Sequence, residues 1–147
     1  MTTETDLAEA VTEALFARDH AAQSLGIAIE AAGPGHARLS MRVRDDMLNS
    51  FGVCHAGFIT ALADSAAGYA ANSHNLNATT GSSQIEFLAP VEPGDRLVAT
   101  AWESLVSGRR ALHDVRVTNQ RDEVVASSRH RSVLMGGQVL GEMKAGD

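Results

Sequence analysis

Residues 49–69 read NSFGVCHAGFITALADSAAGY. From about His55 to about His74 small and apolar residues occupy nearly every position and no proline interrupts them, which predicts one long helix over residues 55–74. Asp64 is the single acidic residue of this run. A carboxylate on an apolar helix costs free energy unless a partner neutralises it or a reaction uses it, so the remainder of the chain has to show which applies.

The segments on both sides of this helix predict a second helix and a set of strands. Apolar residues recur with helical spacing over residues 5–21, with acidic residues in the early part, where the helix dipole favours them. Period-two alternation between turn residues predicts strands at residues 24–32, 36–44, 79–90, 96–107, 109–119 and 123–135. From about Gly136 the chain is expected to end in a frayed tail.

The order of these elements predicts an α+β fold. Strands joined by short turns form an antiparallel sheet, and the long central helix has to cover one of its faces. At 147 residues the chain is expected to be one domain, residues 1–147. The many alanines and glycines of the central helix allow close packing against the sheet or against a second copy. A homodimer is the simplest way to cover the surfaces that remain.

Composition excludes several classes of function. The net charge of −6 argues against nucleic-acid binding, which needs a basic surface. The single cysteine, Cys54, cannot form an internal disulfide and fits a reducing compartment, and no apolar run is long enough to span a membrane. The N-terminus is acidic where a signal peptide would be basic. We therefore expect a cytoplasmic location, and no metal site, because the six histidines lack metal-ligand spacing.

Asp64 shares a helical stripe with Gly57, Thr60 and Gly68, all small or polar. The stripe leaves space in front of the carboxylate, and the amide groups at the start of the helix, two turns away, lack intrahelical partners. Such amides suit a developing oxyanion, so the helix predicts an acyl-transfer site. Desolvation by the neighbouring alanines is expected to raise the pKa of Asp64. The alternative is a buried acid that pairs with an arginine or caps a loop.

Other candidate residues also have two interpretations. Asn49 suits a turn or a cap, and His55 suits the N-cap region of the helix. Cys54 lies beside His55, but no local signature supports a cysteine nucleophile. Arg109 and Arg110 follow Gly108 and form either an exposed hairpin tip or a clamp for the phosphates of a nucleotide-bearing ligand.

The stretch from residue 47 to residue 75, MLNSFGVCHAGFITALADSAAGYAANSHN, resembles the signature of the hotdog-fold acyl-CoA thioesterases of the phenylacetate-degradation (PaaI-like) type. That signature contains an Asn, a short loop, His-Gly-Gly and an apolar helix carrying Ala-Asp-Ser or Ala-Asp-Ala. The later strands in SSQIEFLAPVEPGDRLVATA and SGRRALHDVRVTNQRDEVVASSRHRS resemble the same family. The resemblance covers essentially residues 5–135.

The resemblance implies a hotdog fold, in which a curved antiparallel sheet of about five to six strands wraps a long helix and an extra helix precedes it. It implies dimers with active sites at the interface between the subunits. Two such dimers usually form a tetramer. The implied substrate is an aryl-acetyl-CoA, such as phenylacetyl-CoA or hydroxyphenylacetyl-CoA, or a related small acyl-CoA. Coenzyme A is then part of the substrate, and no separate cofactor, nucleic acid or membrane is expected as a partner.

The resemblance also implies roles for particular residues. Asp64 matches the catalytic carboxylate, either a general base or a nucleophile, and Asn49 matches the residue that positions the thioester or the water from the partner subunit. The backbone N–H of Ala56 matches the oxyanion donor, and His55 a residue that supports the loop. Together with these, the substrate-binding residues expected are Gly57, Thr60, Phe51, Ser65, Arg109 and Arg110.

Two departures from the family pattern bear on specificity. Ala56 stands where the first glycine of His-Gly-Gly is usual, and Ser50-Phe51 replaces a more usual Gly-His pair. A second interpretation is a non-catalytic hotdog module that binds acyl-CoA. A third, a hotdog hydratase, calls for an Asp five residues before a His, and none of the six histidines has one.

Overall fold

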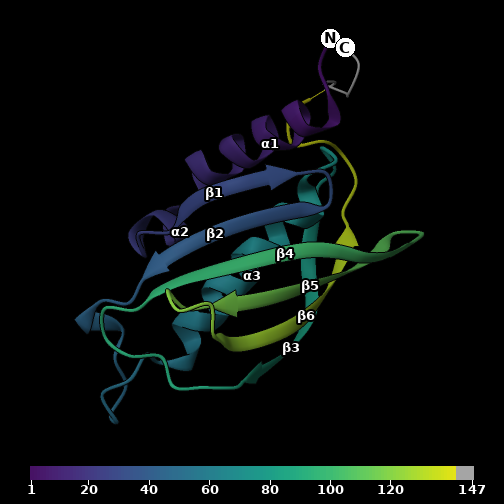
Figure 1. Cartoon of the computed structure of the whole chain (residues 1–147). Helices are drawn as coiled ribbons and strands as arrows, with labels where there is room; N and C mark the ends of the chain where they lie inside the picture. Colours follow the sequence, from purple (N-terminus) through teal and green to yellow (C-terminus); the bar gives the residue numbers. More distant parts are fainter. Residues whose placement is uncertain (142–147) are drawn as a thin grey trace.

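The computed structural model describes residues 1–141, and its strands form one antiparallel sheet (Figure 1). The elements in chain order are α1 (Glu4–Arg18), α2 (His20–Ser24), β1 (Ala28–Gly33), β2 (His36–Arg42), the short 3-10 helix η1 (Asp45–Met47), α3 (Ala56–Asn72), β3 (Ala78–Phe87), β4 (Arg96–Ser107), β5 (Arg110–Thr118) and β6 (Val124–Leu134). The strands lie side by side in the order β1-β2-β4-β5-β6-β3. The predicted α+β arrangement of a long helix, an antiparallel sheet and an extra N-terminal helix is confirmed.

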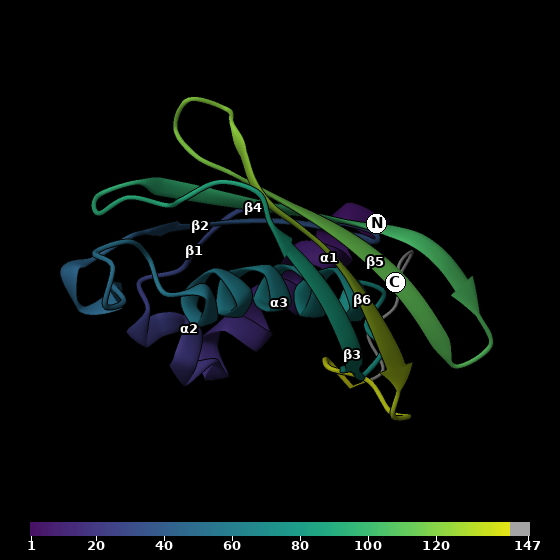
Figure 2. The same ribbon diagram turned by 90° about the horizontal axis from the view of Figure 1, so that it is seen from below.

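Helix α3 lies along the concave side of the sheet (Figure 2) and contacts β2, β4, β5, β3 and β6. Its inward face is fully buried and consists of Leu62, Ala63, Ala66, Ala67 and Ala70. Because four of these five side chains are single methyl groups, the helix backbone approaches the strands closely. The side chains facing them from the strands include Leu39, Leu97, Val115 and Val117, which are also fully buried. This core fixes the position and rotation of α3, and with them the position of Asp64.

The predicted helix over residues 5–21 is wrong in one respect, because the structure has two helices there. Helix α1 begins with a capping box in which Thr3 and Asp6 bind each other's backbone N–H groups. The chain leaves the helical conformation at Asp19, whose carboxylate accepts a hydrogen bond from the N–H of Ala22 at 3.0 Å and so caps α2. An aspartate in this position stabilises a new helix start better than a continued helix.

The first strand is shorter than predicted, since β1 begins at Ala28 and not at residue 24. Residues 24 and 25 complete α2, and Gly26 then adopts a positive φ of 69°. The hairpin between β1 and β2 turns at Pro34 and Gly35. Gly35 has φ 67°, and a Cβ there would lie 2.9 Å from the Cβ of Glu103, so only glycine fits.

The two edges of the sheet differ in how they are covered. Strand β1 packs against α1. Strand β3 is the opposite edge, and within residues 1–141 no strand lies on its outer side. Its ten residues are partly or fully exposed along the whole strand. A long edge strand with free backbone groups is a ready site for pairing with another chain.

The expected frayed tail lies partly outside the described residues. Residues 136–141 form turns that bond back to the segment after α3. The N–H of Asn77 donates to the carbonyl of Gly137 at 3.2 Å, and the N–H of Leu140 donates to the side chain of Asn75 at 2.8 Å. This part of the tail is therefore held and not frayed, and residues 142–147 are not described.

Candidate active site

The backbone N–H groups at the start of α3 differ in whether a hydrogen-bond acceptor lies near them. His55 is the N-cap, with φ −61° and ψ 134°, and its Nδ1 accepts a hydrogen bond from the N–H of Gly57 at 2.9 Å. A Cβ on residue 57 would lie 3.1 Å from that Nδ1, so a glycine at this position leaves room for the imidazole of His55. His55 thus accepts from Gly57, whereas the N–H of Ala56 finds no acceptor within residues 1–141.

Asn49 lies in the loop that leads to this helix start. Its Oδ1 accepts hydrogen bonds from the N–H groups of Phe51, at 2.9 Å, and Val53, at 3.4 Å, which closes the loop. Its side-chain amide nitrogen has no partner within residues 1–141 and remains available as a donor. Asn49 and Ala56 line one pocket of about 350 Å³, whose other walls include Cys54, Ile59, Phe87 and Pro90.

Asp64 lies in the middle of α3, at a different pocket of about 690 Å³. Its Oδ1 accepts two hydrogen bonds, from the hydroxyl of Thr80 on β3 at 2.9 Å and from Nδ1 of His130 on β6 at 3.2 Å. Its side chain is 50% exposed, and Oδ2 has no partner within residues 1–141. The alternative in which an arginine pairs with Asp64 is therefore wrong. The other walls of the pocket come from the junction of α1 with α2, from α3 and from the start of β3.

The expected rise in the pKa of Asp64 is also wrong. The hydrogen bond from His130 lowers the pKa of this carboxyl below its ordinary value, and the hydrogen bond from Thr80 adds to the effect. Partial burial acts in the opposite direction but does not prevail. Both donors stabilise the ionised carboxylate, and they come from strands that the sequence of α3 alone does not reveal.

The two half-sites do not meet within one chain. Ala56 and Asp64 are eight residues apart on α3, which separates them by about 12 Å along the helix axis. A thioester carbonyl has to lie about 3 Å from its oxyanion donor and within reach of the base or nucleophile. Ala56 and Asp64 also line different pockets. The expectation that one helix forms the whole site within a single chain is therefore wrong.

The structure distributes the other predicted residues between these regions. Ser65 and Gly68 line the pocket of Asp64, and Ser65 donates its hydroxyl to the carbonyl of Ala61 at 2.7 Å. Thr60 donates its hydroxyl to the carbonyl of Ala56 at 2.9 Å, and neither Thr60 nor Gly57 lines either pocket. Of the predicted helical stripe, Asp64 and Gly68 therefore line a pocket, whereas Gly57 and Thr60 do not.

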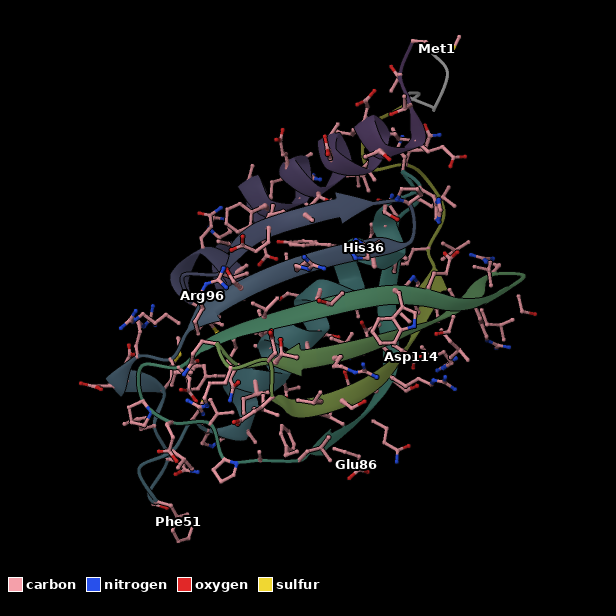
Figure 3. The ribbon with its side chains drawn as sticks, viewed as in Figure 1. Met1, His36, Phe51, Glu86, Arg96 and Asp114 are labelled. Atoms are coloured by element: carbon pink, nitrogen blue, oxygen red, sulfur yellow. The ribbon has the colours of Figure 1, made fainter. Side chains whose placement is uncertain are left out.

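Phe51 and the two arginines lie away from both pockets. Phe51 is 88% exposed at the tip of the loop before α3, pointing away from the sheet (Figure 3). Arg109 is in the turn between β4 and β5, where it donates to the carbonyl of Leu134 at 3.2 Å, and Arg110 begins β5. Neither arginine lines the pocket of Asp64 or that of Asn49.

Sequence reasoning missed both partners of Asp64. A signal for His130 was present, because Arg129 and Arg131 alternate on the outer face of a predicted strand and the residue between them must point inward. In the structure Arg129 pairs with Asp114 at 2.7 Å on that outer face, and His130 is fully buried. Thr80 could not be found in this way. A register shift between Thr80 and Ser82 interrupts the alternation of β3, and such bulges leave no reliable sequence mark.

Cys54 does not contribute a nucleophile to this geometry. It is buried, and burial raises the pKa of its thiol to about 11. At neutral pH such a thiol is protonated and unreactive. Among residues 1–141, no group of three or more His, Cys, Asp or Glu side chains could hold a metal ion, and no helix there is long and apolar enough to cross a membrane.

A long helix in the curve of a six-stranded antiparallel sheet, preceded by an extra N-terminal helix, is the arrangement of the hotdog fold. Residues 51–126 match the model of the thioesterase superfamily. The chain is 37% identical to acyl-coenzyme A thioesterase PaaI of Escherichia coli K12 over 129 residues, which are 88% of this chain and 92% of that protein. The chain belongs to the thioesterase superfamily.

Solved structures show the same relationship. The structure of the E. coli PaaI protein from the phenylacetic acid degradation operon aligns with a TM-score of 0.91 and 34% identity, covering 92% of this chain and 99% of that one. The structure of smu.793 from Streptococcus mutans UA159, bound to acetyl-CoA, aligns with a TM-score of 0.74 and 28% identity, covering 76% of this chain and 90% of that one.

Proposed function

We propose that this protein hydrolyses aryl-acetyl-CoA thioesters, such as phenylacetyl-CoA, or related small acyl-CoA esters to the free acid and coenzyme A. The observation that carries the proposal is the state of Asp64. Its carboxylate is half exposed at a pocket, with one oxygen held by two donors and the other free within residues 1–141. The relative named as an acyl-CoA thioesterase and the neighbour bound to acetyl-CoA support the substrate class.

The chemistry needs few groups. A thioester has weak resonance stabilisation and a good leaving thiolate, so a carboxylate and an oxyanion donor suffice, with no cofactor beyond the coenzyme A of the substrate. Asp64 activates a water as general base or attacks the carbonyl as nucleophile. The N–H of Ala56 stabilises the oxyanion, and the free amide of Asn49 positions the thioester or the water. His55 contributes by capping the helix and holding the loop.

The site is completed by a second copy of the chain. If the β3 edges of two subunits pair and their α3 helices run antiparallel, Asp64 of one subunit comes to face Ala56 and Asn49 of the other. A two-fold axis then creates two identical sites. The same pairing covers the exposed edge of β3 and the exposed Phe87 at its end. Two such dimers form the expected tetramer.

Each region of the site has a proposed part in substrate binding. The pocket of Asp64 takes the acyl group, because Ala61, Ser65, Gly68 and other small side chains leave space there for an aromatic ring. Gly57, Thr60 and Phe51 line the path between the subunits. Arg109, in the turn between β4 and β5, and Arg110, at the start of β5, bind the phosphates of the nucleotide.

A panel of acyl-CoA esters, assayed with a thiol-trapping dye, tests the proposal. We expect thiol release to be fastest with aryl-acetyl esters and to be abolished by Asp64→Ala with the oligomer intact. Arg109→Glu should raise KM without unfolding the protein. Tight binding of acyl-CoA without turnover in the wild-type protein would instead establish the non-catalytic module.

A further inference from the structure

A series of hydrogen bonds runs inward from Asp64 through His130 to Ser128. His130 on β6 is 0% exposed, with its Nδ1 3.2 Å from Oδ1 of Asp64 and its Nε2 2.8 Å from the hydroxyl of Ser128. Ser128 is also buried, and it lies two residues before His130 on the inner face of the same strand. The imidazole is therefore held at both nitrogens, between a buried hydroxyl and the carboxylate at the pocket.

The chemistry of the two neighbours determines the tautomer. An ionised carboxylate has only acceptors, so a neutral imidazole in this position has to carry its proton on Nδ1, which donates to Asp64. Nε2 is then an acceptor, and the hydroxyl of Ser128 must donate to it. The direction of both hydrogen bonds follows, from Ser128 to His130 and from His130 to Asp64.

We propose that His130, oriented by Ser128, is a positioning residue for Asp64. Together with Thr80, it fixes Oδ1 and so directs Oδ2 toward the reacting carbonyl or water. This inference rests on the proposed function of Asp64. Rotation about the last bond of an aspartate is otherwise broad, and a half-exposed carboxylate without such contacts would populate many orientations. Positioning of the reacting group is one of the large contributions to enzymatic rates.

The order of these three residues is that of a Ser-His-Asp triad, but the exposure is reversed. In a serine hydrolase the serine faces the substrate and the acid is buried. Here Ser128 is 6% exposed and lines none of the pockets described above, whereas Asp64 is half exposed at one of them. The reacting end of the chain is therefore the carboxylate, and Ser128 serves to hold the imidazole.

The donor also sets the charge of the carboxylate. By stabilising the ionised form, His130 keeps the pKa of Asp64 low, and Asp64 stays ionised at neutral pH. The other titratable groups around this pocket are Arg18, Asp19 and His20 at the junction of α1 and α2, and Tyr69 on α3. Within the sheet, His113 on β5 lies opposite His130.

His113 provides a matched control. It is 1% exposed, it faces the same side of the sheet as His130, and neither of its ring nitrogens has a hydrogen-bond partner within residues 1–141. Its Nε2 lies 3.9 Å from Oε1 of Glu103, and no hydrogen bond or ion pair joins it to Asp64 within residues 1–141. Replacement of His113 by leucine therefore removes a buried imidazole from the same region without touching the carboxylate.

The test compares His130→Leu, His130→Asn, Ser128→Ala and His113→Leu with the wild-type protein. We expect His130→Leu to lower kcat about 10- to 100-fold at constant KM, because the carboxylate loses its orientation. The acid limb of its kcat–pH profile should move to higher pH, because loss of a donor to the ionised form raises the pKa of Asp64. His130→Asn, which returns an N–H donor near the place of Nδ1, should recover most of both effects.

The remaining variants separate positioning from general damage. Ser128→Ala should give an intermediate loss of kcat, and His113→Leu should keep the wild-type pH profile. Abolished activity in Ser128→Ala, with covalent labelling of wild-type Ser128 by a fluorophosphonate, would overturn the inference in favour of a serine nucleophile. Equal losses in His113→Leu and His130→Leu would overturn it in favour of a packing effect.

Nitrogen-15 NMR of the histidines gives a readout that does not depend on turnover. We expect the resonances of His130 to show the Nδ1–H tautomer, whereas the Nε2–H tautomer would overturn the inference. If Asp64→Ala is inactive and His130→Leu behaves as the wild type, the positioning role fails while the proposed function stands. If the wild-type protein hydrolyses no CoA ester, the proposed function fails. The tautomer of His130 and the titration of the Asp64 carboxyl then still test whether His130 donates a hydrogen bond to Asp64.

Discussion

Replacement of Ala56 by proline should remove the proposed oxyanion donor and little else. Ala56 is the first residue of α3, a position that proline favours because the N–H there has no intrahelical acceptor. The residue before a proline has to be extended, and His55 already has φ −61° and ψ 134°. The N–H of Ala56 has no acceptor within residues 1–141, so no hydrogen bond described there is lost on substitution.

The expected loss of activity is large. Removal of one preorganised oxyanion donor lowers kcat by about 10²- to 10³-fold, which corresponds to about 2.7–4 kcal/mol of transition-state stabilisation. KM should change little, because the donor binds the developing oxyanion more strongly than the ground-state carbonyl. The free energy of unfolding should change by less than about 1 kcal/mol, since the proline ring fits the first turn.

Thiol release from the best CoA ester of the panel measures kcat and KM, and urea unfolding measures stability. Ala56→Gly is the matched control, because it changes the side chain but keeps the N–H. If Ala56→Pro and Ala56→Gly have the same kcat, the oxyanion donor lies elsewhere. If Ala56→Pro is strongly destabilised, the helix start does not have the geometry described above.

A mixture of Ala56→Pro and Asp64→Ala tests whether each active site is formed by two subunits. In the proposed dimer each variant alone carries a defect in both sites, so little or no activity is expected from either. A hybrid dimer has one site with both defects and one intact site, and random mixing makes half of the dimers hybrid. The mixture should therefore recover about a quarter of wild-type activity. A site formed within one chain would recover none.

Three further outcomes follow from particular contacts. His55→Ala should lower the free energy of unfolding by about 1 kcal/mol through loss of the helix cap, and His55→Asn should restore it, as measured by urea unfolding. Tyr69→Phe should cost about 1 kcal/mol in the same assay, because the Tyr69 hydroxyl donates to Asp19 at 2.8 Å and ties α3 to the junction of α1 and α2; an unchanged midpoint would show that this contact adds nothing. Iodoacetamide at neutral pH should leave activity intact, because the Cys54 thiol is buried with a pKa of about 11, and rapid inactivation would contradict its assignment as a structural residue.

The sequence predicted those elements whose ends carry strong local signals. The strand predicted over residues 96–107 agrees with β4 at both ends, because the turn after Pro93 and the glycine at position 108 bracket it. The break at Asp19 was missed, since helical periodicity continues across it and only the side-chain cap on Ala22 shows that a new helix begins. Hydrophobic spacing does not distinguish an aspartate within a helix from one that caps the next.

The prediction of the site was limited by contacts across long sequence distances. The position of Asp64 on α3 could be read from the sequence, but the direction of its pKa shift depends on donors 16 and 66 residues further along the chain. Local composition indicated only the burial of Asp64, which affects its pKa less than the hydrogen bond from His130 does. The alternation around His130 could have indicated one of these donors, whereas the bulge after Thr80 concealed the other.

The position of the two half-sites on one helix also predicts where two subunits should meet. In a two-fold pair, if Asp64 of one α3 faces Ala56 of the other, the axis passes close to the residue midway between them, which is Thr60. Gly57 and Thr60 line neither pocket of a single chain, and their small side chains suit the close approach that this proposed helix crossing needs. Thr60→Phe should therefore separate the subunits in sedimentation and abolish activity, while Thr60→Ser retains both. A Thr60→Phe protein that remains a fully active dimer would show that the helices do not meet at this residue.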